Sequence, residues 1–387
     1  MAGQLVMTRK IKVLQLQNRY NVNASDLAEQ VIQGLPTQTY EVTTLFLRGR
    51  PRSGEPESRA ARSVYFDLNS ASTKGLRLKA LWLLYKHCRA QGYDVVIAHR
   101  FKPINMMMLL NIFLRIPACV GVLHGLGEYE RPYRRWESRA LISKAWRMVG
   151  VSRAVCDDLI NSGAGFKPYN VRQINNAIDI SRAERLQHTK LQARKLLGLP
   201  EDAFVIGTIG RLVPVKGHIQ LLQAFSEIKD DCPQTLLAII GEGRLREEME
   251  AVIQARNLDG RVHLLGEKDD ALQYVRAYDV FVMSSISEGL PLALLEGMSA
   301  RLPVVGSDID SMRPILEDSG GRIYPVGQSA ILAERLREVV LLTPQERTKE
   351  GQRAYEYLCR AHAIEDFRKQ YRDLLEEMLG NGKRNHE

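Results

Sequence analysis

The chain has 387 residues, of which 45% are hydrophobic and 26% are charged. This is the composition of an ordinary globular protein, and the length corresponds to about two or three domains. A disordered polymer, a collagen-like repeat and a small disulfide-stabilised scaffold are excluded. The 5 cysteines are an odd number without a CxxC pair or metal-ligand spacing. We therefore expect reduced cysteines and a cytoplasmic protein.

The net charge of +9 is unevenly distributed along the chain. Residues 1–185 contain 28 Lys and Arg against 14 Asp and Glu, whereas residues 186–387 contain 26 against 31. The basic half is expected to face a polyanion. A membrane surface, a phosphorylated glycan and nucleic acid all fit this charge.

No segment has the pattern of a secretory signal or a membrane-spanning helix. The first residues lack a long apolar stretch before a cleavage site. The most apolar run, residues 103–123, is interrupted by Asn105, Asn111, Arg115 and Pro117. Because a spanning helix needs about 20 nearly uninterrupted apolar residues, this run predicts a helix followed by a buried strand.

Short apolar runs separated by amphipathic stretches predict parallel strands in βαβ units. The predicted strands are residues 11–17, 40–47, 94–99, 118–124, 148–152, 204–210, 235–241, 262–265, 279–284 and 302–307. A helix is predicted after Gly217, where Ile219, Leu222, Phe225 and Ile228 recur every three residues. Each half of the chain is therefore predicted to form a doubly wound α/β domain.

The polar, helical stretch at 176–200 marks the domain boundary. We expect an N-terminal domain over residues 1–178 and a second domain over 179–361. Residues 362–387 are expected to form a helix that packs back toward the N-terminal domain and ends in a frayed tail. In such domains ligands bind at the carboxyl ends of the strands, here around a shared cleft. Chemistry is thus expected after His99, His124, Gly210, Gly241 and Ser284.

The first motif, residues 210–217, follows a predicted strand and opens a predicted helix. Uncapped N–H groups at a helix start favour a phosphate, and Arg211 and Lys216 add two positive charges. Each charge-assisted hydrogen bond contributes roughly 1.5–3 kcal/mol. The Walker A order is absent, and a solvated basic loop is the alternative.

The second motif, residues 288–296, places Glu288 in a loop and Glu296 about one turn into a helix. We expect Pro291 in the first helical turn. A carboxylate repels phosphate, so each Glu is expected to accept hydrogen bonds from sugar hydroxyls. Together with the first motif, this describes a nucleotide-sugar site. The alternative is that Glu288 complements the helix dipole and Glu296 is solvated.

Taken together, the two motifs resemble those of the family 4 glycosyltransferases of the GT-B fold. Supporting matches are residues 151–152, 158–159, 174–179 and 197–200, and the similarity extends from about residue 94 to residue 325. The resemblance implies two Rossmann-like domains, an N-terminal acceptor side and a C-terminal donor side. It also implies a retaining, metal-independent transfer from a UDP-linked sugar, which is a substrate, so no cofactor is expected.

Roles for individual residues follow from the same resemblance. Arg211 and Lys216 would hold the diphosphate, Glu288 the donor sugar and Glu296 the ribose. His124 aligns with a histidine near the reaction centre, although a structural role is the alternative. Apart from the resemblance, the expected helix start places the backbone N–H groups of Gly289, Leu290 and Leu292 at the donor, together with Gly210. Arg19 and His99, at the ends of predicted strands, are expected as additional donor or acceptor contacts.

The sequence departs from the family pattern in two loops. Residues 18–23, after the first strand, contain no glycine, which places close backbone approach to a phosphate in doubt. Asp308 and Asp310 imitate the acidic metal motif of another glycosyltransferase fold, and we expect them to be structural.

Three other functions compete with sugar transfer. A GT-B-like epimerase would use the same donor without an acceptor. A nucleic-acid-binding protein would use the basic half, but the aromatic and basic strand motifs expected for RNA stacking are missing, so no nucleic acid is expected. A catalytically silent subunit conflicts with the intact Arg211, Lys216, Glu288 and Glu296.

The basic half also suggests the acceptor. Residues 74–89 and 131–147 interleave Lys and Arg with Trp82, Tyr133, Trp136 and Trp146, a pattern that suits an anionic interface. We expect peripheral binding to the inner face of the cytoplasmic membrane and a phosphorylated or lipid-linked glycan acceptor, such as a lipopolysaccharide core. Helices with solvated basic faces are the alternative.

Overall fold

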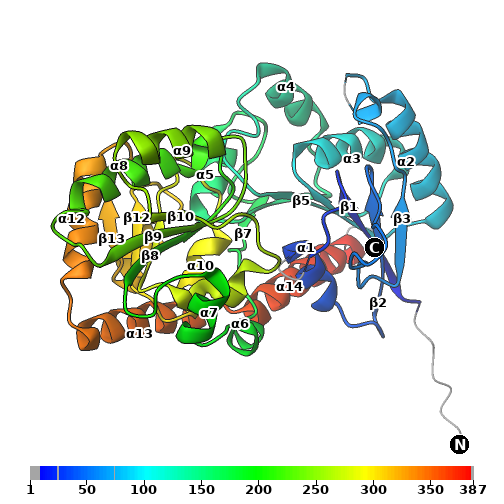
Figure 1. The fold of residues 1–387 in the computed structure, drawn as a ribbon. Helices are drawn as coiled ribbons and strands as arrows, with labels where there is room; N and C mark the ends of the chain where they lie inside the picture. The colour runs from blue at the N-terminus through cyan, green and yellow to red at the C-terminus, as the bar shows by residue number, and fades with distance from the viewer. Residues whose placement is uncertain (1–8, 24–25, 74, 385–387) are drawn as a thin grey trace, which may run out of the picture. The chain divides into compact units, whose positions relative to one another are not determined.

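The computed structural model describes residues 9–23, 26–73 and 75–384. These residues form two compact units (Figure 1). Unit 1 contains residues 1–176 and 365–387, and unit 2 contains residues 177–364. The chain therefore leaves unit 1 for unit 2 and returns to unit 1 at its end.

Unit 1 is built on a parallel sheet of 7 strands within the described residues, in the order β3-β2-β1-β4-β5-β6-β7. The central strands are buried on both faces, which explains their continuous apolar runs. The strands are β1 (Ile11–Gln17), β2 (Tyr40–Phe46), β3 (Arg62–Tyr65), β4 (Val95–His99), β5 (Ala118–Leu123), β6 (Trp146–Gly150) and β7 (Val171–Gln173).

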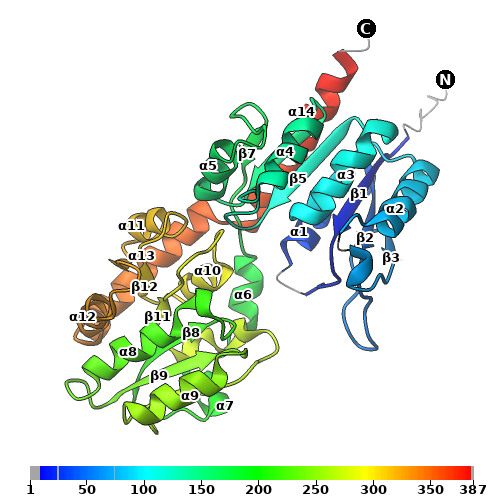
Figure 2. The same ribbon diagram turned by 90° about the horizontal axis from the view of Figure 1, so that it is seen from above.

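Helices cover both faces of this sheet (Figure 2). They are α1 (Leu27–Gln33), α2 (Leu78–Gln91), α3 (Phe101–Leu114), α4 (Pro132–Leu141), α5 (Arg153–Asn161) and α14 (Ile364–Arg384), with the short 3₁₀ helix η1 (Ala71–Thr73). The apolar run at 103–123 is thus the predicted helix and buried strand, α3 and β5.

The last helix, α14, completes unit 1. Phe367, Tyr371 and Leu375 are buried, and the Arg368 guanidinium donates to Oε1 of Gln30 on α1. A side chain at Gly34 would lie 2.8 Å from Cβ of Arg368, so the two backbones approach closely there. The frayed tail was expected after Gly380, but α14 continues through Arg384, and residues 385–387 lie outside the described residues.

Unit 2 contains a parallel sheet of 6 strands among the residues described, in the order β10-β9-β8-β11-β12-β13. Its strands are β8 (Phe204–Ile209), β9 (Thr235–Ile240), β10 (Val262–Leu264), β11 (Val280–Met283), β12 (Val304–Ser307) and β13 (Arg322–Tyr324). The core gathers Ile206, Leu237 and Val282 from the sheet with Leu221 and Phe225 from α8.

Figure 1 shows α8 and α9 on one face of this sheet and α7, α10 and α13 on the other. The helices of unit 2 are α6 (Ile180–Leu186), α7 (Lys190–Leu197), α8 (His218–Ile228), α9 (Arg246–Ala255), α10 (Leu292–Ser299), α11 (Arg313–Ser319), α12 (Ser329–Val340) and α13 (Pro344–Ala361), with the 3₁₀ helices η2 (Pro214–Lys216) and η3 (Ala271–Ala277).

Each sheet has one topological switch point, where the strand order reverses. In unit 1 it lies between β1 and β4, and in unit 2 between β8 and β11. The loops that leave two such neighbouring strands diverge to opposite faces, which opens a crevice for ligands at the carboxyl ends. Functional side chains are therefore expected at these two positions.

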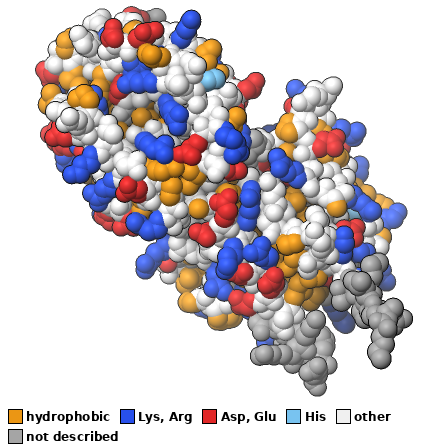
Figure 3. All heavy atoms as spheres, turned by 90° about the horizontal axis from the view of Figure 1, so that it is seen from below, with side chains coloured by type: hydrophobic (Ala, Val, Ile, Leu, Met, Phe, Trp, Pro, Cys, Tyr) orange, Lys and Arg blue, Asp and Glu red, His pale blue; other side chains and the backbone are white. Residues whose placement is uncertain are grey.

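The surface gives two further facts. Among the described residues, no helix combines the length and the apolar character that crossing a bilayer requires. On the face shown in Figure 3, Lys and Arg side chains are interspersed with Asp and Glu side chains, so charges of one sign do not gather there.

Candidate functional site

The first motif forms the loop between β8 and α8 in unit 2. Gly210 follows the strand, residues 214–216 make a 3₁₀ turn, and α8 begins at His218. Gly217 has φ +65°, and a Cβ there would lie 1.9 Å from the carbonyl oxygen of Ser284. Only glycine therefore allows this loop to touch the end of β11.

Two hydrogen bonds join this loop to the segment after β11. Oγ of Ser284 donates to the carbonyl oxygen of Lys216 at 2.9 Å, and the backbone N–H of Ile286 donates to the carbonyl oxygen of Val215 at 2.8 Å. The two loops at the switch point are thus fixed to each other.

The two predicted motifs meet at Lys216 and Glu288. Nζ of Lys216 lies 2.6 Å from Oε1 of Glu288, and Oγ of Ser285 donates to the same oxygen at 2.7 Å. Only 17% of the Lys216 side chain and 15% of the Glu288 side chain are exposed. A cation and a carboxylate, groups able to bind a phosphate and hydroxyl groups respectively, thus lie side by side at the edge of one sheet.

Arg211 lies in the same loop but points to solvent. Its side chain is exposed and makes no hydrogen bond or ion pair with another residue of the described ranges. Its guanidinium is therefore available to an anion. The structure keeps Arg211 and Lys216 on one loop, five residues apart.

A third loop, residues 241–243 after β9, packs closely against the backbone of the first motif. A Cβ at Gly241 would lie 1.9 Å from the carbonyl oxygen of Gly210, and one at Gly243 would lie 2.4 Å from that of Leu212. The N–H of Leu212 donates to the carbonyl oxygen of Glu242. The sequence indicated the end of this strand but not the role of its two glycines as a close backbone support.

Sequence reasoning missed His218. The residue is 2% exposed, and burial, the largest cause, lowers its pKa to about 4. An ideal Cβ at Gly210 would lie 3.6 Å from its Nε2, which places the ring against the first motif. The signal was a histidine directly after Gly217, at the first position of α8.

In the second motif, the helix starts later than expected. Pro291 is the N-cap of α10 rather than part of its first turn, because its ψ of 114° is extended. Leu292 is the first helical residue, whereas Gly289 and the buried Leu290 lie in the preceding loop. The backbone N–H groups of Gly289 and Leu290 therefore lie in the loop before the helix, and that of Leu292 lies at its first residue.

Glu296 lies near other charged groups than Glu288 does. Burial raises the pKa of Glu296 to about 7, the nearby Asp270 raises it further, and Arg182 opposes the shift. Arg182 and Asp270 form an ion pair of their own. Glu296 is thus a partly exposed carboxyl group near Asp270 and Arg182, and the alternative of a fully solvated Glu296 is wrong.

The first residue of the acidic pair at 308 and 310 is engaged in an ion pair. Asp308 pairs with Arg313 at 2.6 Å, which is a local structural role. Within the described ranges, no group of three or more His, Cys, Asp and Glu residues is placed to hold a metal ion.

In unit 1, the structure brings His99 and His124 together. Nδ1 of His99 lies 3.2 Å from Nε2 of His124. His99 ends β4, and His124 directly follows β5. Burial lowers both pKa values, that of His124 to about 4, and the neighbouring Arg100 acts in the same direction. Arg19, after β1, is exposed.

The loop that follows His124 is held from two helices. Oδ2 of Asp158 on α5 accepts from the N–H of Gly127 at 3.1 Å. On α4, Arg134 donates to the carbonyl oxygen of Glu128 at 2.6 Å and Arg135 donates to that of Tyr129 at 2.9 Å. The motif around Asp158 thus fixes the histidine loop.

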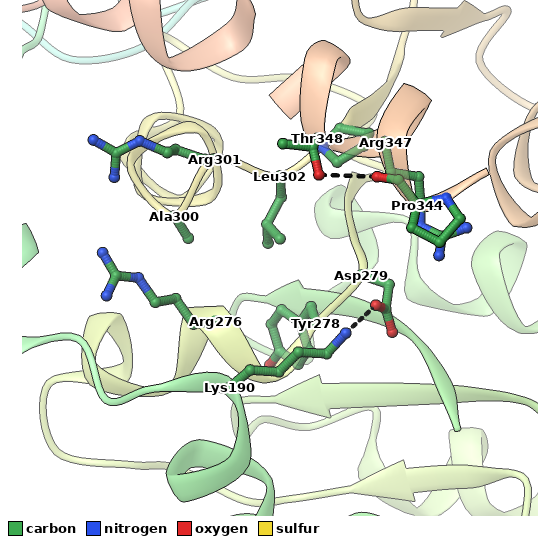
Figure 4. Close-up of a pocket in the computed structure, with 11 residues that line it drawn as sticks. Lys190, Arg276, Tyr278, Asp279, Ala300, Arg301, Leu302, Pro344, Arg347 and Thr348 are labelled. Atoms are coloured by element: carbon green, nitrogen blue, oxygen red, sulfur yellow. Dashed lines mark hydrogen bonds and ion pairs between the residues drawn. The ribbon is translucent and has the colours of Figure 1, made fainter. Parts of the chain in front are cut away.

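A separate pocket of about 320 Å³ lies in unit 2 (Figure 4). It is lined by Asp279 and Pro303, which precede β11 and β12, and by Lys190, Arg276 and Arg301. It therefore lies at the amino-terminal edge of the sheet, opposite to Lys216 and Glu288, and contains no predicted donor residue.

Two parallel Rossmann-like units, each with polar side chains at its switch point, define the GT-B class of proteins. Two family models match the chain, "Glycosyl transferases group 1" over residues 189–357 and "Glycosyltransferase Family 4" over residues 25–182. Together they account for most of both units. The chain belongs to these glycosyltransferases, as the motifs indicated.

Individual relatives agree with this assignment. The chain is 28% identical over 244 residues to UDP-Gal:alpha-D-GlcNAc-diphosphoundecaprenol alpha-1,3-galactosyltransferase of Escherichia coli, covering 60% of this chain and 62% of that protein. It is 28% identical over 206 residues to the lipopolysaccharide core biosynthesis glycosyltransferase LpsE of Rhizobium meliloti, covering 53% and 57%. The matched regions thus span less than two thirds of these relatives.

A solved structure shows the same fold. Anabaena HepE, determined in complex with UDP, superposes with a TM-score of 0.77 at 19% sequence identity, covering 95% of this chain and 100% of that one. At this identity the comparison establishes the architecture.

Proposed function

We propose that this protein transfers a sugar from a UDP-sugar to a lipid-linked or lipopolysaccharide-core glycan, with retention of configuration and without a metal ion. The observation that carries the proposal is the pairing of Lys216 with Glu288 at the switch point of unit 2. The names of the relatives, which act on diphosphoundecaprenol-linked and lipopolysaccharide-core glycans, support the acceptor class, and the UDP bound to HepE supports the donor.

The leaving nucleoside diphosphate develops negative charge that must be stabilised. Lys216 and Arg211 provide two cations, and the N-cap of α8, Gly217, makes no side-chain cap, so the N–H groups of the first turn add a partial positive charge. Fixed donors aimed at developing charge are the largest single source of rate enhancement in many enzymes.

Glu288 takes the second role. When a phosphate draws Lys216 away, the carboxylate is left to accept hydrogen bonds from hydroxyl groups of the donor sugar. Glu296 accepts from the ribose in its deprotonated form. The acceptor hydroxyl attacks on the face from which the diphosphate departs, and a diphosphate oxygen takes its proton.

The outer surface of α2, α3 and α4 is proposed to bind an anionic membrane at the cytoplasmic face. Trp136 is 82% exposed, Phe113 70% and Trp82 60%. An apolar pocket of about 500 Å³ is lined by Leu109, Tyr133, Trp136, Glu137, Ala140 and Leu141. The exposed Arg131 and Arg139 flank these side chains on α4, and aromatic residues beside cations suit a membrane interface.

The structure corrects part of this surface. Trp146, expected at the interface, is 1% exposed and lies in β6, and Leu84 is buried. Lys74 lies outside the described residues. Within α4, Arg134 stacks on Phe101 at 4.1 Å and holds the histidine loop, so its charge serves the fold.

The experiment is a screen of nucleotide sugars for thermal stabilisation, followed by transfer assays with lipid-linked acceptors. Stabilisation by UDP-sugars, with transfer and a retained anomeric configuration by NMR, supports the proposal. Conversion of the donor without an acceptor would indicate an epimerase. Stabilisation by no nucleotide sugar would overturn the proposed donor site.

A further inference from the structure

We infer that His99 is a positioning residue that keeps a proton on Nδ1 of His124 and thereby makes His124 a hydrogen-bond donor toward the substrate. This rests on the proposed function for its consequence in the reaction. The geometry itself lies wholly within unit 1.

The two rings are held by the backbone of neighbouring strands. His99 pairs in register with Val122 on β5, and the N–H of Arg100 donates to the carbonyl oxygen of Val122 at 2.8 Å. His124 follows two residues later. Both rings thus sit at the carboxyl edge of the sheet, with Nδ1 of His99 facing Nε2 of His124 at 3.2 Å.

The backbone next to His99 is strained. Arg100 has φ +68° and ψ 164°, a region that residues with side chains rarely adopt. Arg100 directly follows His99, the last residue of β4, and is the N-cap of α3. Such strain persists only where the surroundings over-determine the backbone, and it concentrates at functional sites.

Both imidazoles are neutral near pH 7, because burial lowers both pKa values and Arg100 adds a nearby positive charge. Two neutral rings form a hydrogen bond only when one of the facing nitrogens carries a proton and the other does not. The proton position on one ring therefore dictates the position on the other.

The surroundings of Nε2 of His99 determine which of the two rings donates the hydrogen bond. Nε2 of His99 is buried and has no hydrogen-bond partner among the described residues. A proton there would be an unpaired buried N–H, which is rarer in proteins than an under-satisfied acceptor. The proton of His99 thus lies on Nδ1 and is donated to Nε2 of His124. His124 consequently carries its own proton on Nδ1.

This assignment gives His124 a defined chemical role. A neutral ring with Nδ1–H donates to a sugar or phosphate oxygen, and it does not remove the acceptor proton. The partly exposed position of His124 leaves the ring accessible to such an oxygen.

Three substitutions separate positioning from packing. His99→Asn keeps an N–H donor near the position of Nδ1, His99→Phe removes it, and His99→Asp places an acceptor there. Histidine-selective ¹⁵N NMR of the ligand-free protein reads the protonated nitrogen of His124 directly, without any need for turnover.

In the wild-type protein and His99→Asn, we expect His124 to be protonated on Nδ1 alone. In His99→Phe we expect a mixture, and in His99→Asp a shift to Nε2–H. Transfer should fall about 10-fold to 100-fold in kcat in the Phe and Asp variants, as for other partners that orient a functional histidine, and far less in the Asn variant.

A wild-type His124 protonated on Nε2, or a His124 tautomer that is the same in all three variants, would overturn the inference. Because the NMR measurement needs no substrate, it is independent of the proposed reaction. A protein that shows the expected tautomers but transfers no sugar would refute the proposed function and leave the positioning intact.

Discussion

Nζ of Lys216 lies 2.6 Å from Oε1 of Glu288, although 72 residues separate the two in the chain. They occupy the loops after β8 and β11, which are adjacent in the sheet. In the ligand-free state each charge is thus neutralised by the other. Under the proposed function, a donor phosphate would replace the carboxylate as the partner of Lys216, which would couple diphosphate binding to the release of Glu288.

Replacement of the two cations is expected to impair catalysis strongly. Lys216→Ala and Arg211→Ala should each lower kcat by about 10²-fold to 10³-fold, the typical loss when a group that stabilises developing negative charge is removed. Lys349→Ala, at an exposed lysine of α13, is the matched control. Near-normal turnover in both single variants, measured with a UDP-sugar and acceptor, would refute the diphosphate assignment.

Glu288→Ala should separate sugar binding from phosphate binding. The variant loses the acceptor for sugar hydroxyls, so transfer should fall strongly. It also frees Lys216 from its ion pair, so we expect UDP itself to bind at least as tightly as in the wild type. Calorimetric titration with UDP and with a UDP-sugar gives the comparison. Equal losses of affinity for both ligands would show that Glu288 supports the loop rather than the sugar.

Chelation of divalent ions is expected to leave transfer unchanged. In the proposed mechanism, Lys216 and Arg211 supply the positive charge that stabilises the leaving diphosphate, so no metal ion is needed. The initial rate should be the same in buffer and after dialysis against excess EDTA. A rate that collapses with EDTA and returns on addition of Mg²⁺ or Mn²⁺ would assign the charge stabilisation to a metal.

The carboxyl group of Glu296 should make unit 2 less stable as the pH rises. Its pKa in the folded state is raised to about 7 from 4.5, so between these values the folded state holds a proton that the unfolded state releases. Stability is therefore lost as the pH rises through this window. The shift limits the effect to about 3 kcal/mol.

Glu296→Gln removes this dependence. The melting temperature of the variant minus that of the wild type, measured by calorimetry, should be larger at pH 8 than at pH 4.5. Glu334→Gln, at an exposed position of α12, should show no such pH-dependent difference. The same difference at both pH values for Glu296→Gln would mean that its carboxyl group titrates normally.

Membrane binding should depend on exposed residues of α4. Trp136→Ala should weaken flotation with vesicles at any salt concentration. The pair Arg131→Glu and Arg139→Glu should weaken it chiefly at low salt on anionic vesicles, because each cation near such a surface contributes about 1 kcal/mol. Leu341→Ala, at an exposed apolar residue of unit 2, is the control.

Arg134 and Arg135 are unsuitable probes of this surface, because both donate to backbone oxygens of the histidine loop. If the wild-type protein ignores anionic vesicles at low salt, the membrane proposal fails. The donor site would be unaffected by that result.

The sequence predicted the strands that are buried on both faces, because a short, continuous apolar run between turn residues is typical of such a strand. It missed β3, β7 and β13, which are 3 or 4 residues long. All three contain an arginine and lie at sheet edges, where one side of a strand needs no apolar cover. Trp146 was assigned to the membrane interface because basic residues surround it in the sequence. Tertiary packing instead buries it in β6.

The two motifs, residues 210–217 and 288–296, could be recognised from the sequence because each is one short contiguous segment. The Lys216–Glu288 contact, in contrast, depends on the order of strands, which βαβ spacing alone does not give. The pairing of His99 with His124 needed the register of β4 and β5. The position of His218 and the raised pKa of Glu296 could not be predicted, because both depend on burial, which is a property of the whole folded unit.

The return of α14 to unit 1 has a consequence for synthesis on the ribosome. Unit 2 is contiguous and can fold as soon as residue 364 has emerged, whereas unit 1 lacks Phe367, Tyr371 and Leu375 until residues 365–384 follow. Unit 1 therefore begins to be synthesised before unit 2 and is completed after it. Until α14 has emerged, unit 1 stays incomplete, and chaperones have their longest opportunity to act on it. A nonsense codon among the codons for residues 365–384 would thus damage the unit whose synthesis began first.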